Sequence, residues 1–190
     1  MSDLYLVTPA VSDAQAFLPV LEAGLVHHQP AAVLLRLVDM PASAARQAVL
    51  LLKPVIQARD IALMLENAPT LAQETGCDGV HLSASYTAAS VKDVRRIIGP
   101  DLQLGVAVGE SRDAAMCAGE DGADYICFGA EDGASLETVS ALTRWWSLMM
   151  ELPVVAQAQT PADLAVLNAS GADFVMPSEQ WWQQPDAWQG

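Results

Sequence analysis

The feature that most constrains this chain is a short phrase that occurs three times. It is Gly-Cys-Asp at 76–78 and Gly-Ala-Asp at 122–124 and 171–173, and an apolar stretch follows each copy. The copies begin roughly 50 residues apart, a period typical of repeat architectures. Each interval has room for two strand-plus-helix units. The repeat therefore indicates βα units arranged around a parallel sheet.

Apolar runs of strand length alternate with helix-forming segments along the whole chain. Eight runs are predicted to be strands: 4–8, 31–37, 61–65, 78–82, 102–108, 124–128, 152–156 and 172–176. Eight helical segments alternate with them, among them 12–26, 87–98 and 41–59, in which Pro54 predicts a kink or an early end. Eight such units close most naturally as a (β/α)₈ barrel. We predict one α/β domain over residues 1–190, a TIM barrel with short loops.

An open, doubly wound sheet is the competing architecture. It usually has fewer strands and a glycine-rich turn after the first strand. The segment Thr8-Pro9-Ala10-Val11, which follows the first predicted strand, has no glycine. The barrel is therefore the favoured prediction.

Composition limits the partners that this chain can have. No apolar run reaches the roughly 18 residues needed to span a bilayer, and no basic segment with an apolar core opens the chain. The net charge is −14, which should repel nucleic acid and anionic membranes. We expect a cytoplasmic protein with neither a nucleic-acid nor a membrane partner.

In a TIM barrel the chemistry takes place where strands end and loops to the helices begin. The chain has only two lysines, Lys53 and Lys92, and both fall in predicted helices. Schiff-base chemistry at the mouth is therefore not expected. The predicted mouth consists of Thr8, Arg36, Asp39, Glu66, Asn67, His81, Ser83, Ser85, Gly109, Glu110, Gly129, Glu131, Asp132, Gln157, Gln159, Ser178 and Glu179.

Arg36 is the most informative charge because it interrupts an otherwise apolar strand. A guanidinium in such a place needs a partner, and its shape suits a carboxylate or a phosphate. It can bind a ligand phosphate, or it can form an ion pair with Glu66 or another acid of the mouth. Glu66, Glu131 and Asp132 could likewise hold Mg²⁺ through their oxygens, or form a solvated acidic rim.

Two further positions leave similar alternatives open. His81 lies between Val80 and Leu82, so it can be an acid or base at the mouth or a hydrogen-bonded histidine of the core. Gly105 and Gly109 bracket the fifth predicted strand. They can admit a close ligand, or they can be packed at a strand end.

Several segments, in this order, carry a resemblance to a known family. They are Leu4-Tyr5-Leu6-Val7-Thr8, Val33-Leu34-Leu35-Arg36, Gly76-Cys77-Asp78-Gly79-Val80-His81-Leu82, Gly122-Ala123-Asp124-Tyr125-Ile126-Cys127-Phe128-Gly129, and Pro153-Val154-Val155-Ala156 with Gly171-Ala172-Asp173. Together they resemble thiamine phosphate synthase and the related thiazole tautomerases. The resemblance implies a barrel that joins hydroxymethylpyrimidine diphosphate to thiazole phosphate with Mg²⁺ and releases pyrophosphate.

The resemblance also implies site residues at matching positions. Arg36 corresponds to the arginine of the family's Gln-x-Arg-x-Lys strand, and Glu66-Asn67 stand where the family has Asn-Asp, whose aspartate binds Mg²⁺. Ser83 follows His81-Leu82 where the family has Gly-Gln. Where the family has Gly-Gly to hold a phosphate, this chain has Gln157-Ala158. By resemblance we expect His81 to be catalytic and Glu66 to bind metal, and Arg36, Asn67, Ser83, Gly105 and Gly129 to bind substrate.

Two functions follow as predictions. The first is a transferase of the thiamine phosphate synthase type that binds small phosphorylated ligands. The alternative is a non-catalytic barrel that binds a small ligand or regulates a partner, because many motif positions differ from the family pattern. Trp181, Trp182 and Trp188 in the tail could also anchor a homodimer, or pack against the barrel's own helices.

Overall fold

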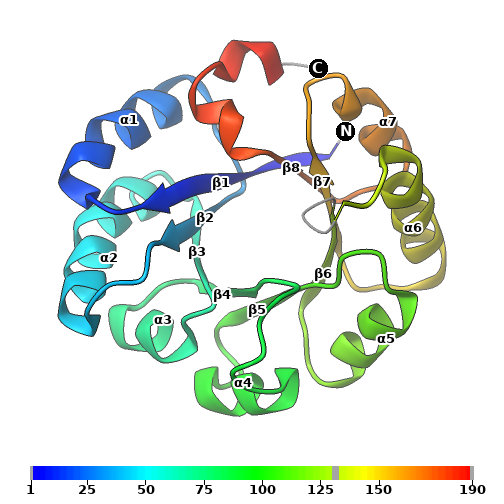
Figure 1. The fold of residues 1–190 in the computed structure, drawn as a ribbon, viewed down its shortest axis with the longest axis horizontal. Helices are drawn as coiled ribbons and strands as arrows, with labels where there is room; N and C mark the ends of the chain where they lie inside the picture. Colours follow the sequence, from blue (N-terminus) through cyan, green and yellow to red (C-terminus); the bar gives the residue numbers. More distant parts are fainter. Residues whose placement is uncertain (1, 130–132, 189–190) are drawn as a thin grey trace.

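The computed structural model describes residues 2–129 and 133–188, and in it the strands close into a parallel barrel (Figure 1). Each strand pairs with its neighbours in the sequence, and β8 pairs with β1. The strands are β1 (Asp3–Val11), β2 (Ala32–Leu37), β3 (Ala62–Glu66), β4 (Gly79–Leu82), β5 (Gln103–Ala107), β6 (Tyr125–Phe128), β7 (Val154–Ala158) and β8 (Phe174–Pro177). The predicted TIM barrel is confirmed.

Helices form a ring outside the strands (Figure 1). They are α1 (Ala14–His27), α2 (Ala42–Gln57), α3 (Pro69–Thr75), α4 (Val91–Ile98), α5 (Arg112–Glu120), α6 (Leu136–Met149) and α7 (Asp163–Ala169), followed by the 3₁₀ helices η2 (Glu179–Trp182) and η3 (Pro185–Trp188). The last βα unit thus ends in short 3₁₀ turns. No helix in the described ranges is long and apolar enough to cross a bilayer.

Among the boundaries that differ from the predicted ones are those of β1, α2 and α4. Strand β1 continues beyond Pro9 to Val11, because the pairing register with β2 shifts between Val7 and Ala10 and accommodates the proline. Helix α2 does not end early but continues beyond Pro54 to Gln57. Helix α4 begins later than predicted, because the Ser90 hydroxyl caps it by accepting from the Asp93 N–H.

The threefold phrase forms a turn and links neighbouring strands of the barrel. Gly76, Gly122 and Gly171 have φ angles of 68°, 105° and 88°, a backbone conformation that glycine adopts without steric cost. Two residues later, each aspartate accepts from a backbone N–H of the preceding strand at 2.7–2.8 Å: Asp78 from Leu63, Asp124 from Leu104, and Asp173 from Val154. The repeat thus ties β4 to β3, β6 to β5 and β8 to β7 at the barrel end opposite the mouth.

The core has two separate parts. One lies between the strands and the ring of helices and contains fully buried side chains such as Leu6, Phe128 and Trp146. The other fills the barrel interior and includes Tyr5 and Tyr125. The interior is therefore packed with side chains, as in other barrels of this type, and ligands have access mainly from its ends.

The tryptophans of the tail pack within the chain itself. Trp181 and Trp188 are buried, and the Trp182 indole N–H donates to the Val7 carbonyl at 2.7 Å. The Trp182 ring also passes so close to Gly24 that a Cβ there would lie 2.7 Å from it. These residues hold the tail against β1 and α1, and the homodimer stays a prediction.

Candidate active site at the mouth of the barrel

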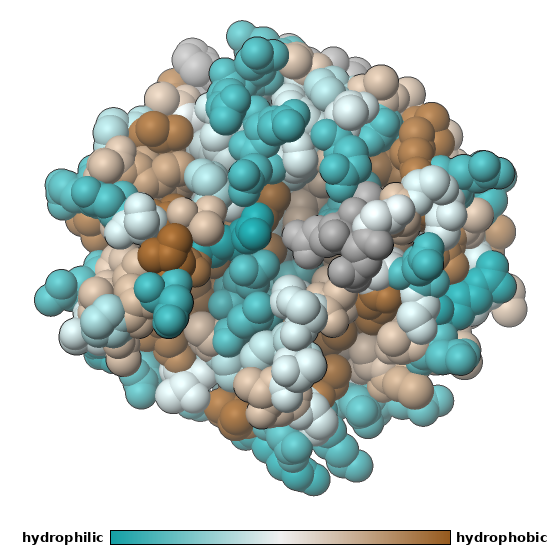
Figure 2. All heavy atoms as spheres, viewed as in Figure 1, coloured by the Kyte–Doolittle hydropathy of each residue, from teal (hydrophilic) through white to brown (hydrophobic). Residues whose placement is uncertain are grey.

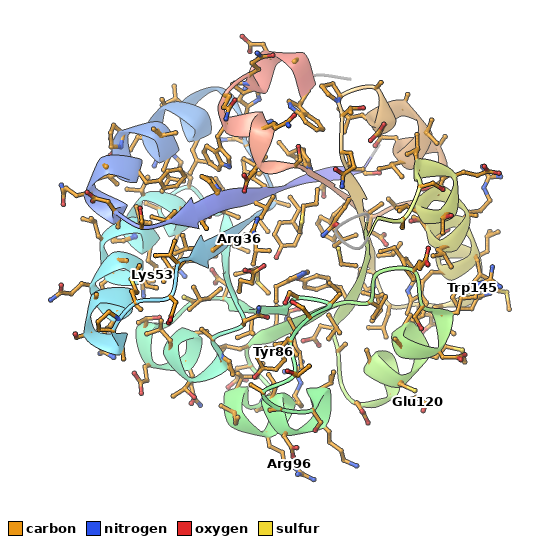
Figure 3. All side chains as sticks on the ribbon, viewed as in Figure 1. Arg36, Lys53, Tyr86, Arg96, Glu120 and Trp145 are labelled. Atoms are coloured by element: carbon orange, nitrogen blue, oxygen red, sulfur yellow. The ribbon has the colours of Figure 1, made fainter. Side chains whose placement is uncertain are left out.

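Arg36 projects from β2 near the centre of the barrel (Figure 3). Its Nε lies 3.4 Å from Glu66 Oε2, and its Nη1 lies 3.4 Å from Glu179 Oε2. The ion pair with Glu66, one of the two alternatives for Arg36, is therefore present. Both contacts are long for charge-assisted hydrogen bonds, and 29% of the Arg36 side chain remains exposed. The guanidinium can still reach a ligand at the mouth.

Asn67 and Ser83 join the ends of β3 and β4. The Ser83 N–H donates to Asn67 Oδ1 at 2.9 Å, and Asn67 Nδ2 donates to Ser83 Oγ at 2.9 Å. Asn67 has a φ of 54°, a left-handed conformation that asparagine tolerates better than most residues. Because it directly follows Glu66, the turn at Asn67 fixes this rim beside Arg36.

Glu66 was predicted to hold Mg²⁺, and its surroundings bear on that role. Its carboxylate faces the Arg36 guanidinium, which would repel a cation. Within residues 2–129 and 133–188, no three acidic, histidine or cysteine side chains gather closely enough to hold a metal. Glu131 and Asp132, the other proposed ligands, lie outside the described residues. By themselves the described residues do not fit a magnesium site, and the metal role of Glu66 stays a prediction.

His81 lies inside the barrel and is 2% exposed. Its Nδ1 is 2.9 Å from the Tyr125 hydroxyl, which is 2.8 Å from the Tyr5 hydroxyl. Burial lowers the pKa of His81 to about 4 and raises the pKa of both tyrosines. The imidazole is therefore uncharged at neutral pH. These surroundings are those of a hydrogen-bonded core histidine, one of the two alternatives for His81. The catalytic role of His81 stays a prediction.

The space beside Gly105 belongs to the protein's own core. A Cβ at this position would lie 1.9 Å from Tyr125 Cζ. The tyrosine ring therefore occupies the volume that a substrate was expected to enter. Of the two alternatives for Gly105, the structure shows the packed glycine.

A pocket of about 130 Å³ opens where β7, β8 and β2 end. Its polar lining comes from Arg36, Gln157, Gln159, Ser178 and Glu179. Gly129 lies beneath the Gln157 side chain, since a Cβ there would be 1.9 Å from Gln157 Oε1. Hydrophilic residues lie over the centre of this face (Figure 2). Gln157 and Glu179 were placed at the mouth from the sequence but were given no role. A glutamine at the end of the apolar seventh strand is itself an indication of a functional position.

The comparisons with known proteins show the family of this chain. A family model described as "Thiamine monophosphate synthase" matches residues 4–179. The chain belongs to this family. It is 42% identical over 188 residues to a thiamine-phosphate synthase of Rhodospirillum centenum, a match that covers 96% of this chain and 90% of the relative. It is also 35% identical to a thiamine-phosphate synthase of Hyphomonas neptunium, with 96% and 87% covered.

A solved structure of the same architecture supports the fold. It is described as thiamine phosphate pyrophosphorylase from Pyrococcus furiosus, and it superposes with a TM-score of 0.78 at 20% sequence identity. The match covers 98% of this chain and 93% of that one. At this identity the likeness concerns the barrel and not the side chains of the mouth.

The mouth of this thiamine monophosphate synthase family member has two groups of predicted residues. Arg36, Asn67 and Ser83 lie at the ends of the neighbouring strands β2, β3 and β4, next to Glu66. Gly129 follows β6 and lies instead beside Gln157 of β7. The predicted residues thus lie in two areas of one rim. Arg36 lies between them and contacts Glu66 and Glu179.

Proposed function

We propose that this chain is a transferase of the thiamine phosphate synthase type, with its substrates bound at the mouth. The observation that carries the proposal is the position of Arg36. Its guanidinium is partly exposed at the centre of the mouth, and among the described residues it contacts two carboxylates at 3.4 Å. A ligand phosphate can replace those contacts with shorter, charge-assisted hydrogen bonds.

The proposed role of Arg36 is to stabilise the leaving pyrophosphate. In the family reaction, negative charge grows on the diphosphate as its bond to the pyrimidine methylene breaks. A guanidinium held in place before the reaction stabilises that charge without reorganising. The Asn67–Ser83 pair beside it keeps the rim rigid, and uncharged His81 packs beneath the mouth.

The proposal is tested by incubating the purified chain with both family substrates and Mg²⁺ and measuring thiamine phosphate. We expect product with the wild type and a loss of roughly 100-fold with Arg36→Met. Arg46→Met is the matched control, because Arg46 forms an exposed ion pair with Glu74 at 3.2 Å on the outer surface. Absence of product above background with the wild type would refute the proposal.

The second candidate is a non-catalytic barrel that binds a small ligand. The observation that favours it is the placement of Arg36 between Glu66 and Glu179, which offsets its charge within the protein. A thermal-shift panel of pyrimidine, thiazole and thiamine phosphates distinguishes the two functions. Stabilisation by a ligand without turnover would identify the non-catalytic barrel, and turnover would exclude it.

A further inference from the structure

The buried hydroxyl groups behind His81 form a chain with a direction, and this direction decides what His81 presents to a ligand. Tyr5, Tyr125 and His81 are joined by hydrogen bonds of 2.8 and 2.9 Å. We propose that Tyr125 is a positioning residue that donates to His81 Nδ1, so that His81 offers its Nε2–H to an acceptor atom of the substrate. His81 is then a hydrogen-bond donor and not a base. The inference rests on the proposed function, because it assigns a role in the same reaction.

The first observation concerns the hydroxyl proton of Tyr5. Tyr5 is 2% exposed, and within residues 2–129 and 133–188 its hydroxyl has Tyr125 as its only hydrogen-bond partner. A buried hydroxyl proton without an acceptor is costly, so the Tyr5 hydroxyl donates to the Tyr125 oxygen. The proton of Tyr125 is then directed to its other partner, His81 Nδ1.

The basicity of the two acceptors gives the same direction. The Tyr125 hydroxyl lies between a phenol oxygen and an imidazole nitrogen. The imidazole nitrogen is the stronger acceptor, because it takes up a proton at about pH 6.5 in water whereas a phenol oxygen does not. Burial lowers the pKa of His81 to about 4, so its ring is neutral at pH 7 and carries one proton. With Nδ1 accepting, that proton is on Nε2.

The Nε2 edge of His81 is available to a ligand at the floor of the mouth. Nε2 makes no hydrogen bond within the described part of the chain, yet it is not among the three side-chain atoms there that are both buried and unpaired. The protein therefore does not enclose it. His81 pairs in register with Glu66 on β3, so the two side chains lie on the same face of the sheet. The ring thus lies beside Glu66, whose carboxylate contacts Arg36.

¹⁵N NMR of the whole chain measures the tautomer directly, because protonated and unprotonated ring nitrogens give well-separated signals. The spectrum of His81→Gln, which lacks the signals of this ring, assigns them among the three histidines. We expect His81 to carry its proton on Nε2 at neutral pH, both in the wild type and in Tyr5→Phe. The second variant removes a buried phenol but keeps the donor to Nδ1. In Tyr125→Phe the Nδ1 signal should shift and both tautomers should be populated.

Turnover of both family substrates with Mg²⁺ tests the donor role. We expect Tyr125→Phe to lower kcat about tenfold and to change KM by less than about twofold, because the donor is misaligned while the rest of the mouth is intact. Tyr86→Phe is the control, since Tyr86 follows β4 and has no part in this chain of hydrogen bonds. The amide nitrogen of His81→Gln can donate near the position of Nε2, whereas the shorter amide of His81→Asn reaches only that of Nδ1. The glutamine variant should therefore keep about tenfold more activity.

Each result supports the inference or overturns it. A proton on Nδ1 in the wild type would overturn it. If Tyr125→Phe leaves the Nδ1 signal or kcat unchanged, Tyr125 is not the positioning residue. If His81→Asn is at least as active as His81→Gln, Nε2 is not the donor. Absence of product with the wild type would refute the proposed function and the donor role with it, whereas the NMR measurement decides separately whether Tyr125 orients His81.

Discussion

The ring of Tyr125 occupies the space in which a side chain at Gly105 would lie. A Cβ at position 105 would be 1.9 Å from Cζ of the ring and 2.2 Å from its hydroxyl oxygen. The missing side chain lets Tyr125 cross to His81 and Tyr5 and form the buried hydrogen-bonded chain of the barrel interior.

Gly105→Ala should therefore destabilise the protein by about 3 kcal/mol, because the ring must move and its hydrogen bonds are strained or lost. Urea unfolding measures the change. In a background that already carries Tyr125→Ala, the same substitution should cost much less. Equal costs in both backgrounds would show that the ring is not the obstacle.

The protonation of His81 predicts a dependence of stability on pH. Its pKa is about 4 in the folded protein against an ordinary value of 6.5, so the unfolded chain binds more protons between these values. The stability contributed by the neutral imidazole is complete above pH 6.5 and is lost as the pH falls towards 4, up to about 3 kcal/mol. Urea unfolding at several pH values measures this slope. It should be clearly shallower in His81→Asn, and an unchanged slope would contradict the prediction.

The aspartate of the threefold phrase should be tested at its third copy. Asp173→Ala leaves the buried Val154 N–H without its side-chain acceptor, and we expect a loss of about 1–3 kcal/mol in unfolding free energy. Asp173→Asn keeps an oxygen at the same place and should cost less. Thermal and urea unfolding of the two variants measure these losses of stability. Equal losses would show that the lost charge, and not the lost hydrogen-bond acceptor, causes the destabilisation.

At Asn67 the contributions of the backbone conformation and of the side chain to stability can be measured separately. Asn67→Ala and Asn67→Gly both remove the two hydrogen bonds with Ser83. Only alanine also has to adopt the positive φ at a steric cost. The alanine variant should thus be less stable by about 1 kcal/mol in chemical unfolding. A glycine variant that is the less stable of the two would contradict this explanation.

The charge of Glu179 should weaken anion binding at Arg36. Glu179→Gln removes a carboxylate 3.4 Å from the guanidinium, so the affinity for inorganic phosphate should rise about fivefold in calorimetric titration. Glu74→Gln is closely matched, because Glu74 also pairs with an arginine and both carboxylate side chains are 53% exposed. The control should leave the phosphate affinity unchanged, and an equal rise in both variants would indicate a general effect of net charge.

Much of the fold could be predicted because it depends on local signals. The threefold phrase predicted the βα repeat. In all three copies the glycine has a positive φ and the aspartate accepts from a backbone N–H of the preceding strand. The start of α4 was missed because Ser90 is the cap, although several earlier residues could also begin a helix. The positions of the strand ends identified the mouth, but not which of its residues meet.

By itself, the sequence determined the barrel, its order of units and the residues at its rim, because strand period, helix caps and glycine turns act over a few positions. Only the tertiary structure decided that Tyr125 fills the space beside Gly105, that Arg36 lies between Glu66 and Glu179, and that Gln157 extends over Gly129. These relationships join strands far apart in the chain. They depend on barrel closure, which sets distances that no local pattern encodes.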